Sequence, residues 1–148
     1  MTMLAEIAGP DPLLVERMLG AARSRAEALG IRVAIALVDG AGNLAGFLRM
    51  PGAFLSSSDL AIDKAYTAAS FAMSTRDFGG LLDQAPPAVR DGLLRRPRLT
   101  AVPGGLSLLI EGRAAGAIGV SGGTDVEDED VAASALALLT QASNSGRE

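Results

Sequence analysis

The stretch EGRAAGAIGVSGG, residues 111–123, decides the fold, because it predicts a turn, an apolar strand broken by glycines and the entry to a helix. Glycine inside a strand indicates that a backbone or a ligand comes close. Thr124 and Glu127 follow with the spacing of a capping box, so the N–H groups of residues 122–126 are expected to converge at a helix N-terminus. Such an end can hold an anion or a developing negative charge. A joint that merely needs small residues is the alternative.

The composition is that of a globular protein and excludes several classes of partner. The 148 residues suit one domain, 1–148, with a core over about residues 12–140. A net charge of −4 argues against nucleic acid, and 3% aromatic residues leave no platform for stacking bases. The apolar runs are too short to cross a bilayer, and no leader precedes them, so we expect no membrane partner and a cytoplasmic location.

Cysteine and histidine are both missing from the sequence. Without cysteine there are no disulfides, thiolate metal sites or thiol nucleophiles. Without histidine there is no Ser-His-Asp chemistry, no usual zinc site and no usual proximal haem ligand. We therefore expect no metal site, and any acid–base chemistry must use Asp, Glu, Lys or Tyr with a shifted pKa.

Hydrophobic periodicity and turn signals predict helices and two hairpins. Asp11 caps the first helix, which Gly30 ends. The other predicted elements are strands 31–38 and 44–50, a helix over 59–73 capped by serines 56–58, a short helical turn over 74–82, strands 106–110 and 114–120, and a helix over 125–140. Hairpins instead of βαβ crossovers predict an α+β fold, a mainly antiparallel sheet packed with helices in the order α-ββ-α-loop-ββ-α.

Several charged side chains are candidates for a site, each with a plainer alternative. Asp39 ends a buried strand, where it either satisfies the turn or points into a cleft. Arg49 is either a carboxylate clamp or a solvated edge charge. Lys64 is either a base of lowered pKa or an ordinary lysine that reaches solvent or pairs with Asp59 or Asp63.

Residues 86–98 are predicted to be irregular and locally basic. The segment holds Arg90, Arg95, Arg96 and Arg98 in an otherwise acidic chain. Solvated side chains are the plainer interpretation, and an anionic ligand or an acidic partner surface is the functional one.

The motifs VDGAGNL, RMPGAFLSSSDLAIDKAYTAASF, PGG and GAIGVSGGTDVEDEDVA closely resemble the GlcG/HbpS-like family, which also forms the C-terminal domain of PduO-type proteins. The resemblance covers about residues 12–140. It implies a profilin-like α+β fold, homo-oligomers from dimers up to octamers, and in some members haem or tetrapyrrole binding. The family's typical positions are here Asp39, Arg49, Lys64, Tyr66, Thr67, Pro103, Gly104, Gly105, Gly119, Ser121, Gly122, Asp128 and Glu129.

This sequence departs from the family pattern where haem is concerned. Haem-binding members are credited with histidine ligation, and there is no histidine here. Pro51 replaces the usual Asp after Arg-Met, and Ser107 replaces the proline often found after PGG. The side chains of Tyr66, Met50, Met73 and Lys64 could ligate iron only in a dedicated environment. The cofactor is therefore unknown, and haem is only a weakened expectation.

Two functions remain open. The first is a homo-oligomeric binding or accessory protein that holds a small carboxylate or a tetrapyrrole, with ligand-binding residues Asp39, Arg49, Pro103, Gly104, Gly105, Gly119, Gly122 and Asp128. The second is a small cofactor-independent isomerase or lyase that moves a proton on a carbonyl or carboxylate substrate. Its base would be Lys64 or Glu129 and its donor Tyr66 or Ser121, while the N–H groups of residues 121–123 would stabilise an enolate-like charge.

Overall fold

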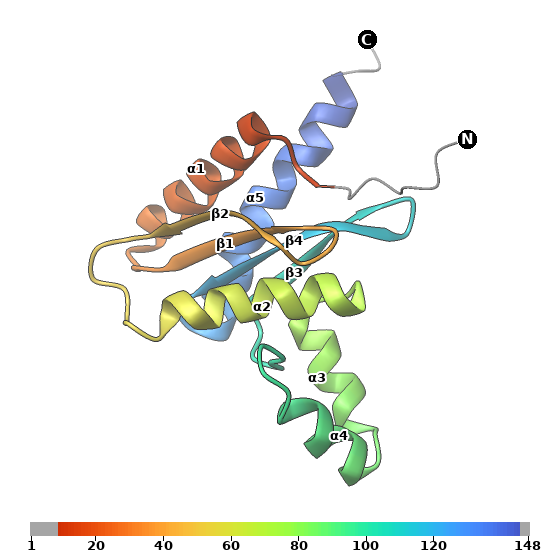
Figure 1. The fold of residues 1–148 in the computed structure, drawn as a ribbon. Coiled ribbons are helices and arrows are strands. Elements are labelled where there is room, and N and C mark those ends of the chain that lie inside the picture. Colours follow the sequence, from red (N-terminus) through yellow and green to blue (C-terminus); the bar gives the residue numbers. More distant parts are fainter. Residues whose placement is uncertain (1–8, 146–148) are drawn as a thin grey trace.

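The computed structural model describes residues 9–145, which form five helices and four strands (Figure 1). The elements are α1 (Pro12–Leu29), β1 (Ala34–Asp39), β2 (Leu44–Arg49), α2 (Ser57–Phe71), α3 (Thr75–Asp83), α4 (Pro87–Leu94), β3 (Gly105–Ile110), β4 (Arg113–Ser121) and α5 (Asp125–Ser145). None of the helices in this described part is long and apolar enough to cross a membrane.

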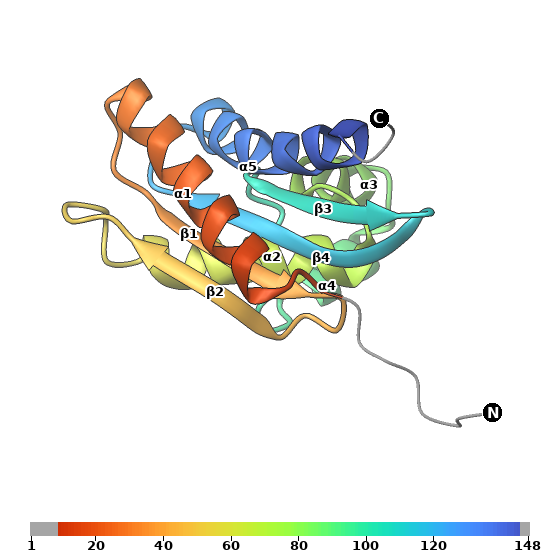
Figure 2. The same cartoon turned by 90° about the horizontal axis from the view of Figure 1, so that it is seen from above.

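The four strands form one antiparallel sheet in the order β2-β1-β4-β3. Helices α1 and α5 cover one face of the sheet and α2 lies across the other (Figure 2). The central strand pair places Ala36 opposite Gly119 and Asp39 opposite Gly116. The predicted α+β architecture with two hairpins is confirmed.

The two faces of the sheet are packed differently. Between the sheet, α1 and α5 lie large buried side chains such as Met18, Ile35 and Ile118. The α2 face is lined by small side chains: Ala34, Ala36, Val38, Ala61, Ala65, Ala68, Ala69 and Ala117. Because these side chains are short, α2 lies close to β4, and a Cβ built on Gly119 would overlap the carbonyl oxygen of Ala61. Gly119 therefore serves helix packing, whereas a Cβ on Gly116 would meet the Val38 carbonyl of the neighbouring strand.

Three predicted helix ends are confirmed by hydrogen bonds or backbone angles. The Leu14 N–H donates to Asp11 Oδ1 at 2.8 Å, and Gly30 ends α1 in the left-handed conformation with φ 72°. At the start of α5, the Thr124 N–H donates to Glu127 Oε1 at 3.0 Å and the Glu127 N–H donates to Thr124 Oγ1 at 3.2 Å. The predicted serine cap of α2 is wrong in detail, since Ser56 makes no side-chain cap bond.

The segment predicted to be irregular contains a helix. Pro87 begins α4, because a proline at the first helical position needs no N–H partner. We call residues 75–98, which comprise α3, α4 and the turn after them, the arm; Figure 1 shows that it projects away from the sheet. The base of the arm is anchored by Phe78, which is fully buried and stacks on Phe71 with 4.5 Å between ring centroids. No residue of α4 is buried.

Candidate functional site

Lys64 is the only lysine in the chain, and its ammonium group forms a buried ion pair. Lys64 Nζ donates to Asp128 Oδ2 at 3.0 Å and to the Val120 carbonyl at 2.7 Å. The two charged side chains are 1% and 4% exposed. Neither Asp59 nor Asp63 is the partner of Lys64, because α2 turns this residue towards the sheet and the start of α5.

Burial disfavours the charged forms of both partners. It lowers the pKa of the Lys64 amine, although the charge of Asp128 opposes the shift. Burial also raises the pKa of the Asp128 carboxyl, against the charge of Lys64 and the N–H groups of Gly123 and Gly122. A lysine of lowered pKa can act as a base when a substrate reaches it, but here its nitrogen has two protein acceptors and almost no solvent contact.

The N-terminus of α5 is occupied by carboxylates of the helix itself. The Gly123 N–H donates to Asp128 Oδ1 at 2.8 Å, and the Val126 N–H donates to Asp125 Oδ1 at 3.0 Å. The Thr124 N–H is taken by Glu127 in the capping box. An anion or an enolate at this end would have to displace these side chains, which favours the plainer prediction of a strand-to-helix joint.

The glycines predicted to surround a guest are packed against protein atoms. A Cβ on Gly104, where φ is 127°, would lie 2.6 Å from the Val120 carbonyl and 2.8 Å from Lys64 Nζ. A Cβ on Gly105 would lie 2.7 Å from Thr75 Cγ2, and one on Gly122 would overlap the Arg32 carbonyl. Gly104 and Gly105 therefore pack directly against Lys64, whereas Gly119 packs against Ala61 of α2. Ser121 is buried, and the ion pair itself is too enclosed to admit a ligand beside it.

Glu129 belongs to a second, exposed ion-pair cluster. Arg76 donates to both Glu129 oxygens, at 2.7–3.1 Å, and to Asp125 Oδ2 at 3.1 Å. Arg76 was not considered in the sequence interpretation. The signal that could have found it is the four-residue spacing of Asp125 and Glu129, which places two carboxylates on one helix face.

Two turn candidates have structural partners. Asp39 Oδ1 accepts the N–H groups of Ala41 and Asn43 at 2.9 and 3.0 Å, so this side chain satisfies the β1–β2 turn. The exposed Arg49 donates to the Ala53 carbonyl at 2.6 Å and braces the loop after β2.

The only tyrosine, Tyr66, is half-buried on α2. The Arg98 guanidinium stacks 3.8 Å above the centroid of its ring. A Cβ on Gly42 would lie 3.2 Å from the same ring. Thr67, next to Tyr66 on α2, fixes the segment after α4, because its hydroxyl donates to the Arg98 carbonyl and accepts the Thr100 N–H.

A hollow of about 470 Å³ lies between α3, α4 and residues 101–103. Three charged residues line it: Arg76, Asp83 and Arg90. The other lining residues are apolar or small: Gly79, Gly80, Leu82, Leu94, Ala101 and Pro103. Its volume is in the range of small-molecule sites. Pro103, one of the predicted ligand-binding residues, lines this hollow, whereas the predicted catalytic residues Lys64, Tyr66 and Ser121 do not.

A smaller hollow of about 130 Å³ lies beside the end of α1 and is lined by Glu27, Gly30, Ile31, Arg32 and Met50. Within residues 9–145, no three acidic side chains gather in a way that could hold a metal ion.

The chain is similar to a family of known proteins in both sequence and structure. The family model described as "Haem degrading protein HbpS-like" matches residues 13–137. The corrinoid adenosyltransferase PduO of Citrobacter freundii is 35% identical over 127 residues, which are 84% of this chain and 37% of that relative. A double mutant of Streptomyces reticuli HbpS superposes with a TM-score of 0.84 at 31% identity, covering 94% of this chain and 92% of that one. The PduOC:heme complex superposes with a TM-score of 0.80 at 30% identity, covering 87% and 94%.

Proposed function

The chain belongs to the HbpS-like family. On that premise we propose that it is a small-ligand-binding or accessory protein whose ligand occupies the hollow between α3, α4 and residues 101–103. The observation that carries the proposal is this hollow, because it is open and large enough for a small organic molecule. Three of the candidate catalytic residues have protein partners instead: Lys64 and Glu129 are in ion pairs, and Tyr66 lies under Arg98.

The chemistry of the hollow suits a ligand with an apolar body and a carboxylate. Leu82, Leu94 and Pro103 provide apolar contact. Arg90 supplies the cation. Among the described residues its one ion pair is with the exposed neighbour Asp91, at 3.2 Å, so donors of its planar guanidinium are available to a ligand. Arg76 is already engaged by Glu129 and Asp125. Asp83 on α3 would repel a carboxylate, so the ligand's carboxylate is expected to lie beside Arg90 on α4.

The residues of the hollow do not fit iron ligation. None of them is a histidine, cysteine, methionine or tyrosine, the side chains that usually hold haem iron. Elsewhere, Met50 is buried, Tyr66 lies under Arg98 and Lys64 is paired with Asp128. A relative solved with heme makes a tetrapyrrole one ligand to test. Here its carboxylates, and not its metal, would be the bound groups.

The alternative function, proton transfer by Lys64 or Glu129, ranks second. Lys64 Nζ would first have to leave both the Asp128 carboxylate and the Val120 carbonyl, and Glu129 would have to leave Arg76. Solvent-deuterium exchange into small carboxylates, compared in Lys64→Met and Glu129→Gln under conditions where circular dichroism shows both to be folded, tests this alternative. Exchange by the wild type that both variants lose would favour the enzyme.

The binding proposal is tested by titrating the protein with haemin, metal-free protoporphyrin and benzoate, followed by absorbance or calorimetry. We expect saturation at one equivalent by at least one of them, with similar affinity for haemin and the metal-free ring if tetrapyrroles bind. Arg90→Gln should weaken binding by roughly tenfold or more, since a hydrogen bond to a charged group contributes about 1.5–3 kcal/mol. Arg113→Gln, at the exposed start of β4, is the matched control. Equal losses in both variants, or no saturable binding, would refute the proposal.

A further inference from the structure

Two opposite charges line the hollow between α3 and α4 without pairing with each other. Asp83 is the last residue of α3, and Arg90 lies in the first turn of α4. Among residues 9–145, no ion pair holds Asp83, and the one ion pair of Arg90 is with its exposed neighbour Asp91. Because the carboxylate and the guanidinium are not in contact, the space between them is available to a ligand.

Both charges stand where their own helix disfavours them. The carbonyl end of a helix carries partial negative charge, and the N–H end carries partial positive charge. Asp83 lies at the carbonyl end of α3 and Arg90 lies near the N–H end of α4, so each side chain meets a partial charge of its own sign. Local rules of this kind are often broken at functional sites. A cation beside Asp83 and an anion beside Arg90 would each suit both the side chain and the helix end.

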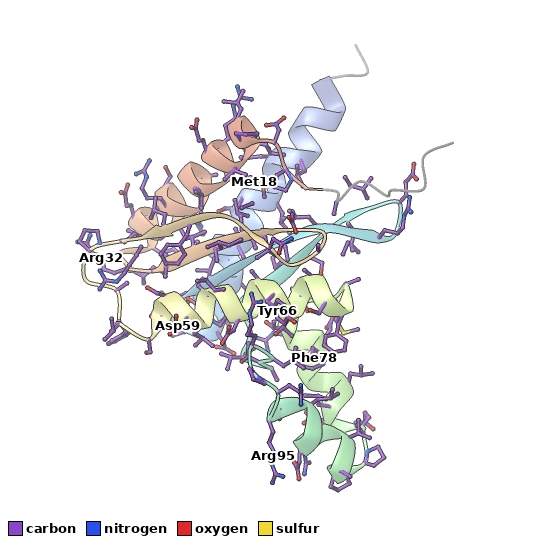
Figure 3. All side chains as sticks on the ribbon, viewed as in Figure 1. Met18, Arg32, Asp59, Tyr66, Phe78 and Arg95 are labelled. Carbon is purple, nitrogen blue, oxygen red and sulfur yellow. The ribbon has the colours of Figure 1, made fainter. Side chains whose placement is uncertain are left out.

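The net charge of the arm is divided in the same direction. Residues 75–83 contain one arginine and two aspartates, a net charge of −1. That arginine, Arg76, is already paired with two carboxylates of α5. Residues 87–98 contain four arginines and one aspartate, a net charge of +3. Figure 3 shows one of these arginines, Arg95, on the outer part of the arm, away from Phe78 at its base. The hollow therefore lies between an acidic helix and a basic one.

We propose that the ligand of this hollow is a zwitterion, an amino acid or another amino-carboxylate with an apolar body. Its carboxylate binds Arg90 and its ammonium group binds Asp83, while Leu82, Leu94 and Pro103 contact the apolar body. This inference rests on the proposed function, because it takes the hollow as the ligand site and adds a second charged anchor. A monocarboxylate would leave Asp83 without a partner, and a second carboxylate placed there would be repelled.

Isothermal titration calorimetry at pH 7 with matched pairs of ligands tests the ammonium contact. Leucine and 4-methylpentanoate differ only in the ammonium group, and so do 4-(aminomethyl)benzoate and 4-methylbenzoate. In at least one pair the amino-carboxylate should bind about fivefold more tightly, as expected for an ion pair with an exposed carboxylate. The pair that shows this gain reports the separation of ammonium and carboxylate that the hollow accepts. The gain should shrink in high salt, since exposed charges are screened.

Two variants assign the gain to a single carboxylate. Asp83→Asn should remove it, because the amide carries no charge. Asp77→Asn should keep it and is the matched control, since Asp77 is also exposed on α3 but does not line the hollow. Circular dichroism shows whether both variants are folded.

The outcomes separate this inference from the proposed function. No gain in either pair, a gain that survives Asp83→Asn, or a gain that Asp77→Asn also removes overturns the inference. If haemin, benzoate or 4-methylbenzoate still binds saturably in that case, the proposed function stands. If none of the ligands binds saturably, the proposed function and the inference both fail.

Discussion

Replacing Lys64 by methionine should destabilise the protein strongly, because it leaves a carboxylate buried without its counter-ion. The substitution keeps an unbranched apolar stem but removes the donor to Asp128 Oδ2 and to the Val120 carbonyl. Asp128 would be left with the backbone N–H groups of Gly123 and Gly122. Breaking one side of a buried ion pair costs about 3–5 kcal/mol. We expect a loss of this size in the free energy of unfolding at pH 7.

The loss should shrink as the solution is made more acidic. In the wild type, burial already holds the pKa of Asp128 above its ordinary 3.8, and without Lys64 it must rise further. The folded variant therefore binds a proton at a pH where the unfolded chain does not. Its free energy of unfolding should increase relative to the wild type as the pH falls from above the folded pKa towards 3.8.

Urea unfolding followed by circular dichroism at pH 7 and pH 5 measures both effects. The double variant Lys64→Met with Asp128→Asn should recover much of the loss, since its neutral amide can still accept the Gly123 N–H. Arg25→Met is the matched control, because it breaks an ion pair with Asp130 that is 40% exposed or more and should change the midpoint little. A Lys64→Met loss below about 1 kcal/mol, or one independent of pH, would refute the reasoning.

Three further predictions follow from packing and charge. An acylating reagent should leave Lys64 unmodified in the native protein and modify it in urea, because its side chain is 1% exposed; mass spectrometry that finds rapid native modification would contradict this burial. Gly119→Ala should lower the melting temperature severely, since the new methyl group overlaps the Ala61 carbonyl. Gly20→Ala on α1 meets no atom within 4 Å and should stabilise the helix by about 0.5–1 kcal/mol. Equal effects of the two changes on the melting temperature would be contrary to this account. Hydrogen bonds from Arg76 hold the pKa of Asp125 below 3.8, so Arg76→Gln should raise it in carboxyl NMR titrations. The contribution of this ion pair to the stability of the fold is complete above pH 3.8 and is lost as the pH falls through the pKa of Asp125 in the folded protein. An unchanged Asp125 titration in the variant would disprove the pairing.

Elements whose signals are local in the chain could be predicted from the sequence. Asp11, Gly30 and the Thr124–Glu127 capping box mark helix ends because each acts on backbone groups a few residues away. The two hairpins follow from apolar runs separated by turn residues, and the alanines of α2 indicate close approach to a sheet. Family membership was also evident from the spacing of these motifs, and the family model confirms it.

Contacts between distant segments were decided only by the tertiary structure. The partner of Lys64 is 64 residues away, on α5, and no local rule prefers Asp128 over the nearby Asp59 and Asp63. The clustered glycines were expected to leave space for a guest, but whether a missing Cβ leaves a cavity or admits a helix depends on what packs there, and here α2 and Lys64 fill the space. The hollow between α3, α4 and residues 101–103 arises because α4 is a helix that stands away from the sheet. The apolar pattern of residues 86–98 does not encode this position of α4.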